Sequence, residues 1–353
     1  MPILHDVPLA SRTTLGVGGP ARTIVDALDE IEAVEAILAA DRQREPVLIL
    51  GGGSNLVVAD AGFAGTVVAF ATRGIDLRPS DDDTVLVEVA AGESWDAVVE
   101  MAVGEGLAGV ECLSGIPGTA GATPIQNVGA YGQELADTLA TVRVLDRHDG
   151  DVHTLLAADC AFGYRDSRFR SAEPGRYAIL AITLRLRRGP PAPVRQGEVA
   201  AGLAETESTL AAVRDIVLKV RKRKAMLVDP RNPETRSAGS FFVNPVVPAG
   251  LADAIRARAP AGAPPLAVWD VGPGRVRIPA AWLIEQAGFP RGLEWGPVGL
   301  SRRHALALVN RGNATAAAVV ALAREVRAGV VATFGVSLQP EPVFVGFVGD
   351  PLG

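Results

Sequence analysis

The chain has 353 residues, of which 48% are apolar and 21% are charged, and its formal net charge is −6 at pH 7. This length predicts two or three domains, and the composition is typical of a folded globular protein rather than a disordered chain. The negative net charge argues against a protein that binds nucleic acid without regard to sequence, since such a protein needs a basic face. We expect no nucleic-acid partner.

The cysteines and the apolar stretches exclude further classes. Cys112 and Cys160 form no C-x-x-C pair, so we expect neither a metal site nor a disulfide framework. Residues 1–15 lack the apolar core of a signal peptide. Charged side chains interrupt the most apolar late stretch, residues 314–333, and no segment is suited to crossing a bilayer. We therefore expect a cytoplasmic protein without membrane contact, and we expect a monomer.

The first part of the chain predicts a small β-α-β unit. A helix is expected over residues 29–40, where Asp29 and Glu32 form a capping-box pattern in front of an apolar face. A buried strand over residues 47–50 then runs into a glycine turn, and another strand is expected over residues 66–70.

The middle of the chain predicts strands on both sides of a long irregular segment. We expect a strand over residues 85–90, a helix over 94–103, and strands over 139–145 and 177–186. Residues 111–134 lie between them and are rich in Gly and Thr. Loops of this length in compact domains usually serve a function.

The last part of the chain begins with a Pro-rich connector over residues 189–197 and a helix over 209–224. The pattern is neither all-α nor a regular βα repeat, so it predicts an α+β fold with a break near residues 190–204. Further helices are expected over 280–287 and 314–329, and strands over 305–310, 334–338 and 343–347.

Two glycine-rich segments, Leu50 to Leu56 and Gly115 to Thr123, could each bind a phosphate group. Neither has the spacing of a Walker loop or of G-x-G-x-x-G. Glycine tolerates positive φ, so successive backbone N–H groups can turn inward and grip a diphosphate. One such turn is more often only structural, but two of them favour binding. The polar amides and small residues of 126–132 extend the second segment and suit a flavin ring and its ribityl chain.

These segments resemble the family of UDP-N-acetylenolpyruvoylglucosamine reductases, in the long form with a substrate-binding loop. The resemblance covers residues 10 to 347 and rests on motifs in the family's order: 14–21, 50–56, 115–134, 162–169, 237–245, 278–288, 301–310 and 338–342. It implies an α+β fold with a vanillyl-alcohol-oxidase-type FAD-binding domain of two subdomains and a smaller α/β substrate-binding domain. The implied domains are 1–75, then 76–205 with 335–353, and 206–334.

The resemblance also implies FAD as cofactor, NADPH as co-substrate and UDP-N-acetylglucosamine enolpyruvate as substrate. We expect noncovalent FAD. Neither main glycine loop contains His, and although Cys112 lies just before the second loop, the resemblance implies a family that holds FAD noncovalently. The expected cofactor-binding residues are Gly51, Gly52, Gly53, Ser54, Asn55, Gly115, Ile116, Pro117, Gly118, Thr119, Gly121, Ala122, Gln126, Asn127, Gly129, Ala130 and Tyr131.

The implied reaction passes hydride from the flavin N5 to the vinyl carbon of an enolpyruvyl ether, which leaves an enolate to be stabilised and protonated. By this resemblance Arg165 and Glu341 stabilise the enolate and Ser240 donates the proton. Glu341 can help only when protonated, which burial would favour. Taken singly, each residue also has a structural explanation: a surface ion pair, a solvated loop carboxylate and a turn residue. Their joint occurrence in three motifs favours catalysis.

Four residues are expected to bind the substrate. Lys224, at the end of the predicted helix 209–224, could neutralise a phosphate of UDP, although a cation is also favourable at any helix C-terminus. Asn244 could bond the phosphate or the sugar, and His304 lies where the family has a polar residue near the substrate. Gln196 stands where long-form members carry a Tyr that folds over the diphosphate, so it or Arg195 would replace that contact.

Two alternatives stay open at this point. One is another flavin enzyme of the same fold, such as an alcohol or sugar-lactone oxidase, which would not need Ser240 and Glu341 together. The other is a noncatalytic nucleotide-binding protein, which would purify without a flavin. A purely structural role is the least favoured, because dense glycine segments dilute a core without improving its packing.

Overall fold

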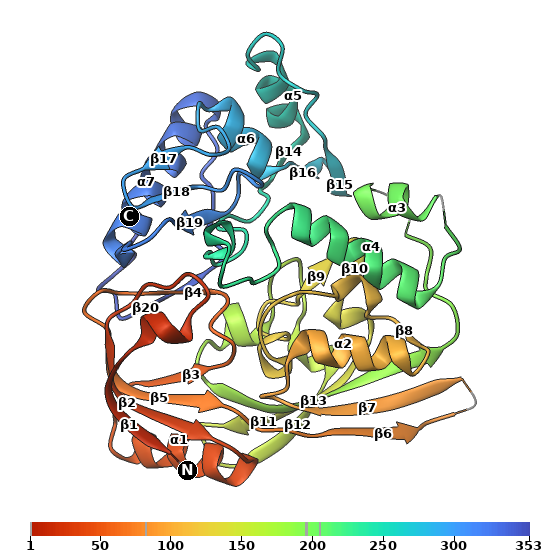
Figure 1. Ribbon diagram of the computed structural model, residues 1–353, viewed down its shortest axis with the longest axis vertical. Helices are drawn as coiled ribbons and strands as arrows, with labels where there is room; N and C mark the ends of the chain where they lie inside the picture. Colours follow the sequence, from red (N-terminus) through yellow and green to blue (C-terminus); the bar gives the residue numbers. More distant parts are fainter. Residues whose placement is uncertain (1, 82, 195–196, 205) are drawn as a thin grey trace. The chain divides into compact units, whose positions relative to one another are not determined.

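The computed structural model describes residues 2–81, 83–194, 197–204 and 206–353 (Figure 1). The chain forms two compact units. Unit 1 contains residues Met1–Val7, Ala21–Gly53 and Ala64–Leu227, and unit 2 contains Pro8–Pro20, Ser54–Phe63 and Val228–Gly353. Gln196, expected to contact the substrate, lies outside the described residues together with Arg195.

The first sheet of unit 1 has four strands in the order β1-β2-β5-β3. Strands β3 and β5 are parallel, with Val47 opposite Thr66. The predicted helix is confirmed as α1, and the Asp29 carboxylate accepts a hydrogen bond from the Glu32 N–H (2.8 Å), which caps its first turn. The elements are β1 (Ile3–Pro8), β2 (Pro20–Ala27), α1 (Glu30–Arg42), β3 (Val47–Leu50) and β5 (Phe63–Phe70).

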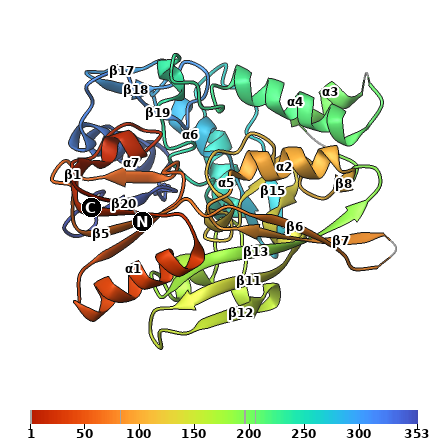
Figure 2. The same ribbon diagram turned by 60° about the horizontal axis from the view of Figure 1, so that its bottom comes forward.

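The second sheet of unit 1 has six strands, which pair antiparallel in the order β12-β11-β13-β7-β6, with β8 also on β13. Helix α2 (Trp95–Gly104) lies over one face of this sheet (Figure 2). Its Trp95 and Val98 belong to the same buried apolar cluster as Val87 and Ile182 of the sheet. The predicted strands and helix of this region are confirmed. The strands are β6 (Ile75–Pro79), β7 (Thr84–Ala90), β8 (Leu107–Ala108), β11 (Leu139–Asp146), β12 (Val152–Leu156) and β13 (Tyr177–Arg188).

Helices α3 (Gly197–Leu203) and α4 (Leu210–Arg223) also belong to unit 1. The predicted helix is confirmed as α4, which Thr209 caps by accepting a hydrogen bond from the Ala212 N–H (3.1 Å). Val199 of α3 packs against apolar side chains of α4. The compact units are not the three domains expected from the resemblance, where residues 206–227 fall in the substrate domain. That assignment follows ligand-binding roles and stays a prediction.

Unit 2 is built from short sheets around a core that α6 and α7 share with several strands. Its sheets have the orders β14-β16-β15 and β17-β18-β19, and β20 pairs in parallel with β4. The helices are α5 (Ala249–Ala257), α6 (Ala280–Gln286) and α7 (Ala316–Phe334). The strands are β4 (Leu56–Val58), β14 (Val246–Pro248), β15 (Trp269–Gly272), β16 (Arg275–Arg277), β17 (Glu294–Trp295), β18 (Val298–Leu300), β19 (Leu308–Asn310) and β20 (Val343–Val345).

Two sequence-based expectations for unit 2 are corrected. The strand expected over residues 334–338 is wrong: α7 continues to Phe334, and Gly335 ends it in the left-handed conformation (φ +70°). The strand expected over 305–310 is shorter, because the Ala307 N–H bonds to the His304 carbonyl (3.1 Å) and turns the chain before β19. In the part of the chain that is described, no helix is both long enough and apolar enough to span a membrane.

Candidate functional site

The two glycine loops touch each other within unit 1. A Cβ on Gly52 would lie 2.7 Å from the Gly118 Cα, and a Cβ on Gly51 would lie 2.5 Å from the Thr119 Oγ1. Any side chain at either position would therefore separate the loops. The sequence analysis predicted that both loops bind one cofactor. Their contact in the structure is the arrangement that a shared ligand requires.

The facing loops offer backbone donors that the protein itself does not use. Within the described residues, no acceptor takes the N–H groups of Gly52, Gly53, Gly118 or Thr119. Gly53 is buried, where an unpaired N–H is costly. Neutral, convergent amide donors of this kind fit the diphosphate of FAD. The residues present in unit 1 therefore suit the cofactor that the sequence predicted.

The second loop is anchored to the start of α2. The Trp95 N–H donates to the Gly118 carbonyl (3.1 Å), and the Ala120 N–H donates to the Glu93 carbonyl (2.8 Å). The Trp95 side chain is fully buried, and its indole N–H reaches the Leu113 carbonyl (3.3 Å). These bonds fix the loop backbone on both sides of Thr119, so its free donors are held in place before any ligand binds.

Charged side chains hold the Gly115 end of the same loop. The Asp96 carboxylate accepts the Gly115 N–H (2.6 Å) and is itself held by Arg214 through two bonds (2.6 and 3.0 Å). The Arg221 Nε donates to the Gly115 carbonyl (3.0 Å). Burial opposes ionisation of Asp96, but the bonds from Arg214 and Gly115 outweigh it and hold its pKa below the ordinary value. Burial also lowers the pKa of Arg221.

The sequence analysis did not predict this group of charges, because only residues inside the two loops were considered as ligand donors. A signal existed: Arg214 and Arg221 are seven residues apart on a predicted helix, which places them on the same face. Asp96, in the first turn of another predicted helix, looked like an ordinary partner of the helix dipole. Nothing local indicated that Asp96 and Arg221 would meet at Gly115.

The side chains of two expected cofactor residues make contacts within the protein. The Asn127 amide donates to Glu134 (2.8 Å) and to the Gly163 carbonyl (3.1 Å), so its side chain has a structural task. Tyr131 packs in the apolar cluster of α3 and α4, and burial raises the pKa of its hydroxyl. Both residues have positive φ (+47° and +51°), which non-glycine residues rarely adopt. Any contact they make with a flavin stays a prediction.

Arg165 lies beside the same segment. Its Nη2 donates to the Gly129 carbonyl (2.8 Å), its guanidinium lies 6.0 Å from the Tyr164 ring centre, and its φ is +55°. The neighbouring Asp166 carboxylate accepts the Ser167 N–H (2.8 Å). Three expected site residues, Asn127, Tyr131 and Arg165, thus have strained backbones, which is common where a site fixes a side chain against its preference.

In unit 2 the segments that carry the other two expected catalytic residues, Ser240 and Glu341, pair with each other. The segment after Ser240 runs antiparallel to residues 339–341: the Glu341 N–H donates to the Phe241 carbonyl (2.9 Å), and Phe242 bridges Pro340. The half-buried Ser240 hydroxyl has no hydrogen-bond partner within the described residues. A hydroxyl without an internal acceptor is suited to bond a ligand.

The expected substrate residues differ in what they offer. The Asn244 Oδ1 accepts the Ala280 N–H at the start of α6 (2.9 Å), which leaves its NH2 group for a ligand. The Lys224 ammonium is paired with Glu198 of α3 (2.9 Å), which is also 3.1 Å from Arg223. His304 is half-buried in the turn before β19. None of these positions excludes a substrate contact, and their roles stay predictions.

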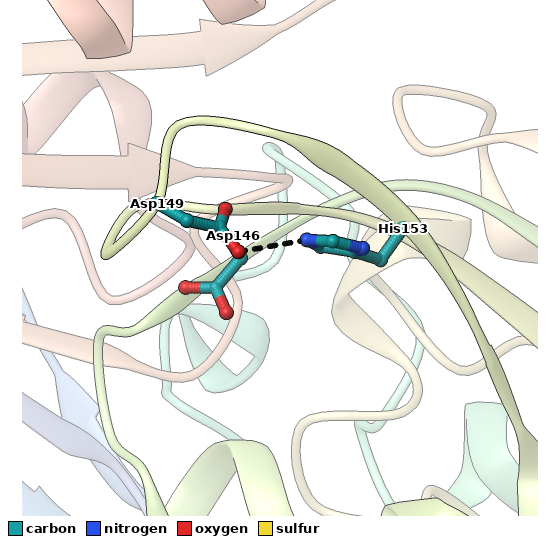
Figure 3. A group of neighbouring side chains, drawn as sticks. All are labelled: Asp146, Asp149 and His153. Carbon is teal, nitrogen blue, oxygen red and sulfur yellow. Dashed lines mark hydrogen bonds and ion pairs between the residues drawn. The ribbon is translucent and has the colours of Figure 1, made fainter.

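One cluster outside these loops has the residue types of a metal site. Ligand atoms of Asp146, Asp149 and His153 lie within 4.8 Å of one another at the turn between β11 and β12 (Figure 3). However, the buried Asp146 carboxylate accepts two bonds from the Arg176 Nε (2.9 and 3.0 Å). His153 is bonded to Asp149 (2.9 Å). A guanidinium already neutralises the buried carboxylate, so we assign no metal to this turn.

Comparisons with known proteins agree with this geometry. A model of FAD binding domains matches residues 21–156, and a model of the C-terminal domain of UDP-N-acetylenolpyruvoylglucosamine reductase matches residues 230–345. The reductase of that name from Thermobifida fusca is 48% identical over 97% of this chain and 98% of its own length. The chain belongs to the UDP-N-acetylenolpyruvoylglucosamine reductase family. The relative from Streptomyces coelicolor is also 48% identical, over 97% of this chain and 90% of its own.

A solved structure leads to the same family. The crystal structure of the reductase from Thermus caldophilus covers 98% of this chain and 99% of its own, with a TM-score of 0.68 and 27% identity. Membership makes the chain a flavin-dependent oxidoreductase and confirms the expectations of FAD, of an α+β fold with an FAD-binding domain, and of the family itself.

Proposed function

We propose that the chain reduces UDP-N-acetylglucosamine enolpyruvate to UDP-N-acetylmuramate, with NADPH as co-substrate and noncovalently held FAD. The observation that carries the proposal is that the segments of Ser240 and Glu341 pair in unit 2, through the bond from the Glu341 N–H to the Phe241 carbonyl. The chain also has a 48% identical relative that bears that reductase's name. The alternatives of an oxidase or a simple nucleotide-binding protein give no reason for that pairing.

The reaction adds two hydrogens across a carbon–carbon double bond. When bound, FAD supplies a hydride to the terminal vinyl carbon, which turns the CH2 group into a methyl group. The electron pair of the double bond moves onto the adjacent carbon and its carboxylate, so the enolate carries two negative charges. Fixed donors aimed at such developing charge are the largest contribution that a protein makes to this kind of step.

The roles of the three proposed catalytic residues follow from their chemistry. Arg165 is a permanent planar cation that matches a carboxylate, and its bond to the Gly129 carbonyl fixes its direction. Glu341, in its protonated form, donates a hydrogen bond to an enolate oxygen. Ser240 delivers the proton to the carbon next to the carboxylate, because so basic an enolate accepts a proton even from a weak, well-placed acid.

The substrate's UDP group would be held by separate residues. Lys224 would exchange Glu198 for the diphosphate, and the Asn244 NH2 group would donate to the diphosphate or the sugar. These two contacts bind the substrate without touching the reacting carbons, so they should affect KM more than kcat. The proposal places the enzyme in the cytoplasm as a monomer, where both the UDP-sugar and NADPH are available.

Steady-state turnover by the purified protein tests the proposal. We expect a flavin absorbance band, FAD released intact by acid precipitation, and NADPH oxidation that depends on the enolpyruvyl substrate and yields UDP-N-acetylmuramate by mass spectrometry. Flavin that stays attached after precipitation would refute noncovalent binding. NADPH oxidation at the same rate with and without the substrate would refute the reductase.

A further inference from the structure

A threonine outside the expected site residues contacts the serine segment. The Thr14 Oγ1 donates to the Ser237 carbonyl (2.7 Å) and lies 3.5 Å from the Ser54 carbonyl. Ser237 is 6% exposed, so water cannot replace this bond. Thr14 therefore connects the end of the first glycine loop with the segment that leads to Ser240.

An asparagine makes the matching connection to the other catalytic residue. The Asn55 Nδ2 donates to the Glu341 carbonyl (3.2 Å), and the Asn55 carbonyl accepts the Val343 N–H (2.9 Å). The Glu341 N–H in turn donates to the Phe241 carbonyl (2.9 Å). Asn55 thus holds the Glu341 backbone from the side opposite to the serine segment.

Together these bonds close a ring within unit 2. It runs from Ser54 through Thr14 to Ser237, along the chain to Phe241, across to Glu341, and back through Asn55 to Ser54. Every bond joins uncharged groups, and each is independent of salt and of pH near neutrality. The ring contains the end of a cofactor loop and the backbones of both proposed catalytic residues.

We propose that Thr14 and Asn55 are positioning residues, which fix the segments of Ser240 and Glu341 against the Ser54–Asn55 end of the first glycine loop. The proposal rests on the proposed function. It gives Asn55 a role different from the cofactor contact expected for its side chain, since the amide donates to the Glu341 carbonyl. Thr14 acts only through Ser237 and touches no reacting atom.

The Thr14 segment is itself rigid enough for this role. The Asn310 Nδ2 donates to the carbonyls of Leu15 and Gly16 (3.1 Å each), and Asn310 is 5% exposed. Leu15 is fully buried in the unit 2 core. An anchored backbone lets a single hydroxyl set the distance to Ser237. Displacements of about 1 Å in such supports can lower a rate by about a hundredfold.

The test uses the FAD-loaded full chain with Thr14→Val, which keeps the shape and removes the hydroxyl, and Thr14→Ser, which restores it. Thr13→Val is the matched control, because within the described residues the Thr13 hydroxyl bonds only inside residues 10–17. It lies 3.4 Å from the Ala10 and Val17 carbonyls and accepts the Gly16 N–H (3.2 Å). Flavin is reduced with dithionite without oxygen, then mixed with UDP-N-acetylglucosamine enolpyruvate, and its reoxidation is followed. FAD affinity is measured separately by fluorescence of the apoprotein titrated with FAD.

We expect Thr14→Val to slow reoxidation at saturating substrate by about 10- to 100-fold, while FAD affinity and flavin reduction by NADPH stay near wild type. Thr14→Ser and Thr13→Val should behave like the wild type. Equal reoxidation rates for Thr14→Val and wild type would overturn the inference, as would parallel losses of FAD affinity and reoxidation. If Thr14→Val does not fold, Thr14→Ala, which also removes the hydroxyl, decides by the same criteria. A wild type that is not reoxidised would refute the proposed function instead.

Discussion

The two units fix their expected site residues by different means. In unit 1 the Gly115 end of the second glycine loop is fixed by charged side chains. Asp96 bonds to both Arg214 and the Gly115 N–H, and Arg221 bonds to the Gly115 carbonyl. In unit 2 the segments of Ser240 and Glu341 are fixed by backbone and amide bonds without charge. A charged support suits a loop that binds an anionic cofactor. A neutral support leaves the charge at the reacting centre to the catalytic groups themselves.

The first way to sharpen this contrast is Ser240→Ala. The substitution removes only a hydroxyl without an internal partner in the described residues, so the neutral support of unit 2 should survive while proton delivery fails. We expect substrate-driven reoxidation to fall by about 10³-fold, with flavin reduction by NADPH unchanged. Stopped-flow absorbance measures both half-reactions, and Ser11→Ala at an exposed site is the control. Equal losses in both half-reactions would reject the proton-donor role.

Glu341 tests whether its donor must be a carboxyl group. Glu341→Ala should slow reoxidation by about 10²-fold, because one fixed donor to the enolate is lost. Glu341→Gln keeps a neutral N–H donor and the backbone bonds to Phe241 and Asn55, so it should lose less. The same stopped-flow assay ranks the variants. A Gln variant as slow as the Ala variant would show that the acidic proton itself is required.

A substitution at Asp96 tests the charged support in unit 1. Asp96→Asn leaves the Arg214 guanidinium, whose side chain is 12% exposed, without its carboxylate. We expect FAD affinity to fall about tenfold, by titration of the apoprotein with FAD, because the loop support is weakened. Glu100→Gln is the control, since Glu100 is exposed and lies 3.7 Å from the same Arg214. Unchanged FAD affinity in Asp96→Asn would show that these charges do not support FAD binding.

Acid provides a second test of the same carboxylate. The pKa of Asp96 is lower in the folded chain than its ordinary value of 3.8. Its stabilising contribution is therefore complete above that value and is lost as the pH falls through the lower folded-state pKa. The thermal midpoint of the wild type should decrease more steeply below pH 3.8 than that of Asp96→Asn. If the thermal midpoints of the wild type and Asp96→Asn fell in parallel below pH 3.8, the lowered pKa of Asp96 would be contradicted.

The smallest expected effect concerns the cation proposed for the substrate. Glu198 competes with a phosphate for Lys224, so Glu198→Gln should lower KM for the UDP substrate by a factor of about two to five and leave kcat unchanged. The pair is partly exposed (35% for Lys224 and 46% for Glu198), which limits the effect. Initial-rate kinetics measure both constants. The control is Asp215→Asn, which removes the exposed ion pair of Asp215 with Lys219 on α4. A raised KM would assign Glu198 to binding rather than competition.

Local sequence patterns predicted the helices well because their signals are local. Asp29 and Thr209 cap α1 and α4, and each sits next to an apolar face. The end of α7 was missed because residues 330–334 are equally suited to a helix or a strand, and only Gly335 ends the helix. The glycine loops could be predicted because their glycines stand out in the sequence. The structure requires glycine at Gly51 and Gly52, since both are in close contact with the other loop.

The supports of the site were beyond sequence reasoning because they join residues that are distant in the chain. Nothing near Asp96 indicates Gly115, and nothing near Thr14 indicates Ser237. Residue type also does not show which groups are already bonded: Asn127 has the chemistry of a ligand residue, and its amide donates to Glu134 within the protein. Composition identifies groups that can bind a ligand, whereas the fold decides which of them are already bonded.

A single turnover of the unaltered protein is the most direct test of the proposed reduction. The FAD-loaded chain, reduced with dithionite in the absence of oxygen, is mixed with one equivalent of UDP-N-acetylglucosamine enolpyruvate. We expect the flavin absorbance to return completely and one UDP-N-acetylmuramate to form per flavin. A flavin that stays reduced, or one that is reoxidised without forming the lactyl ether, would contradict the proposed reduction.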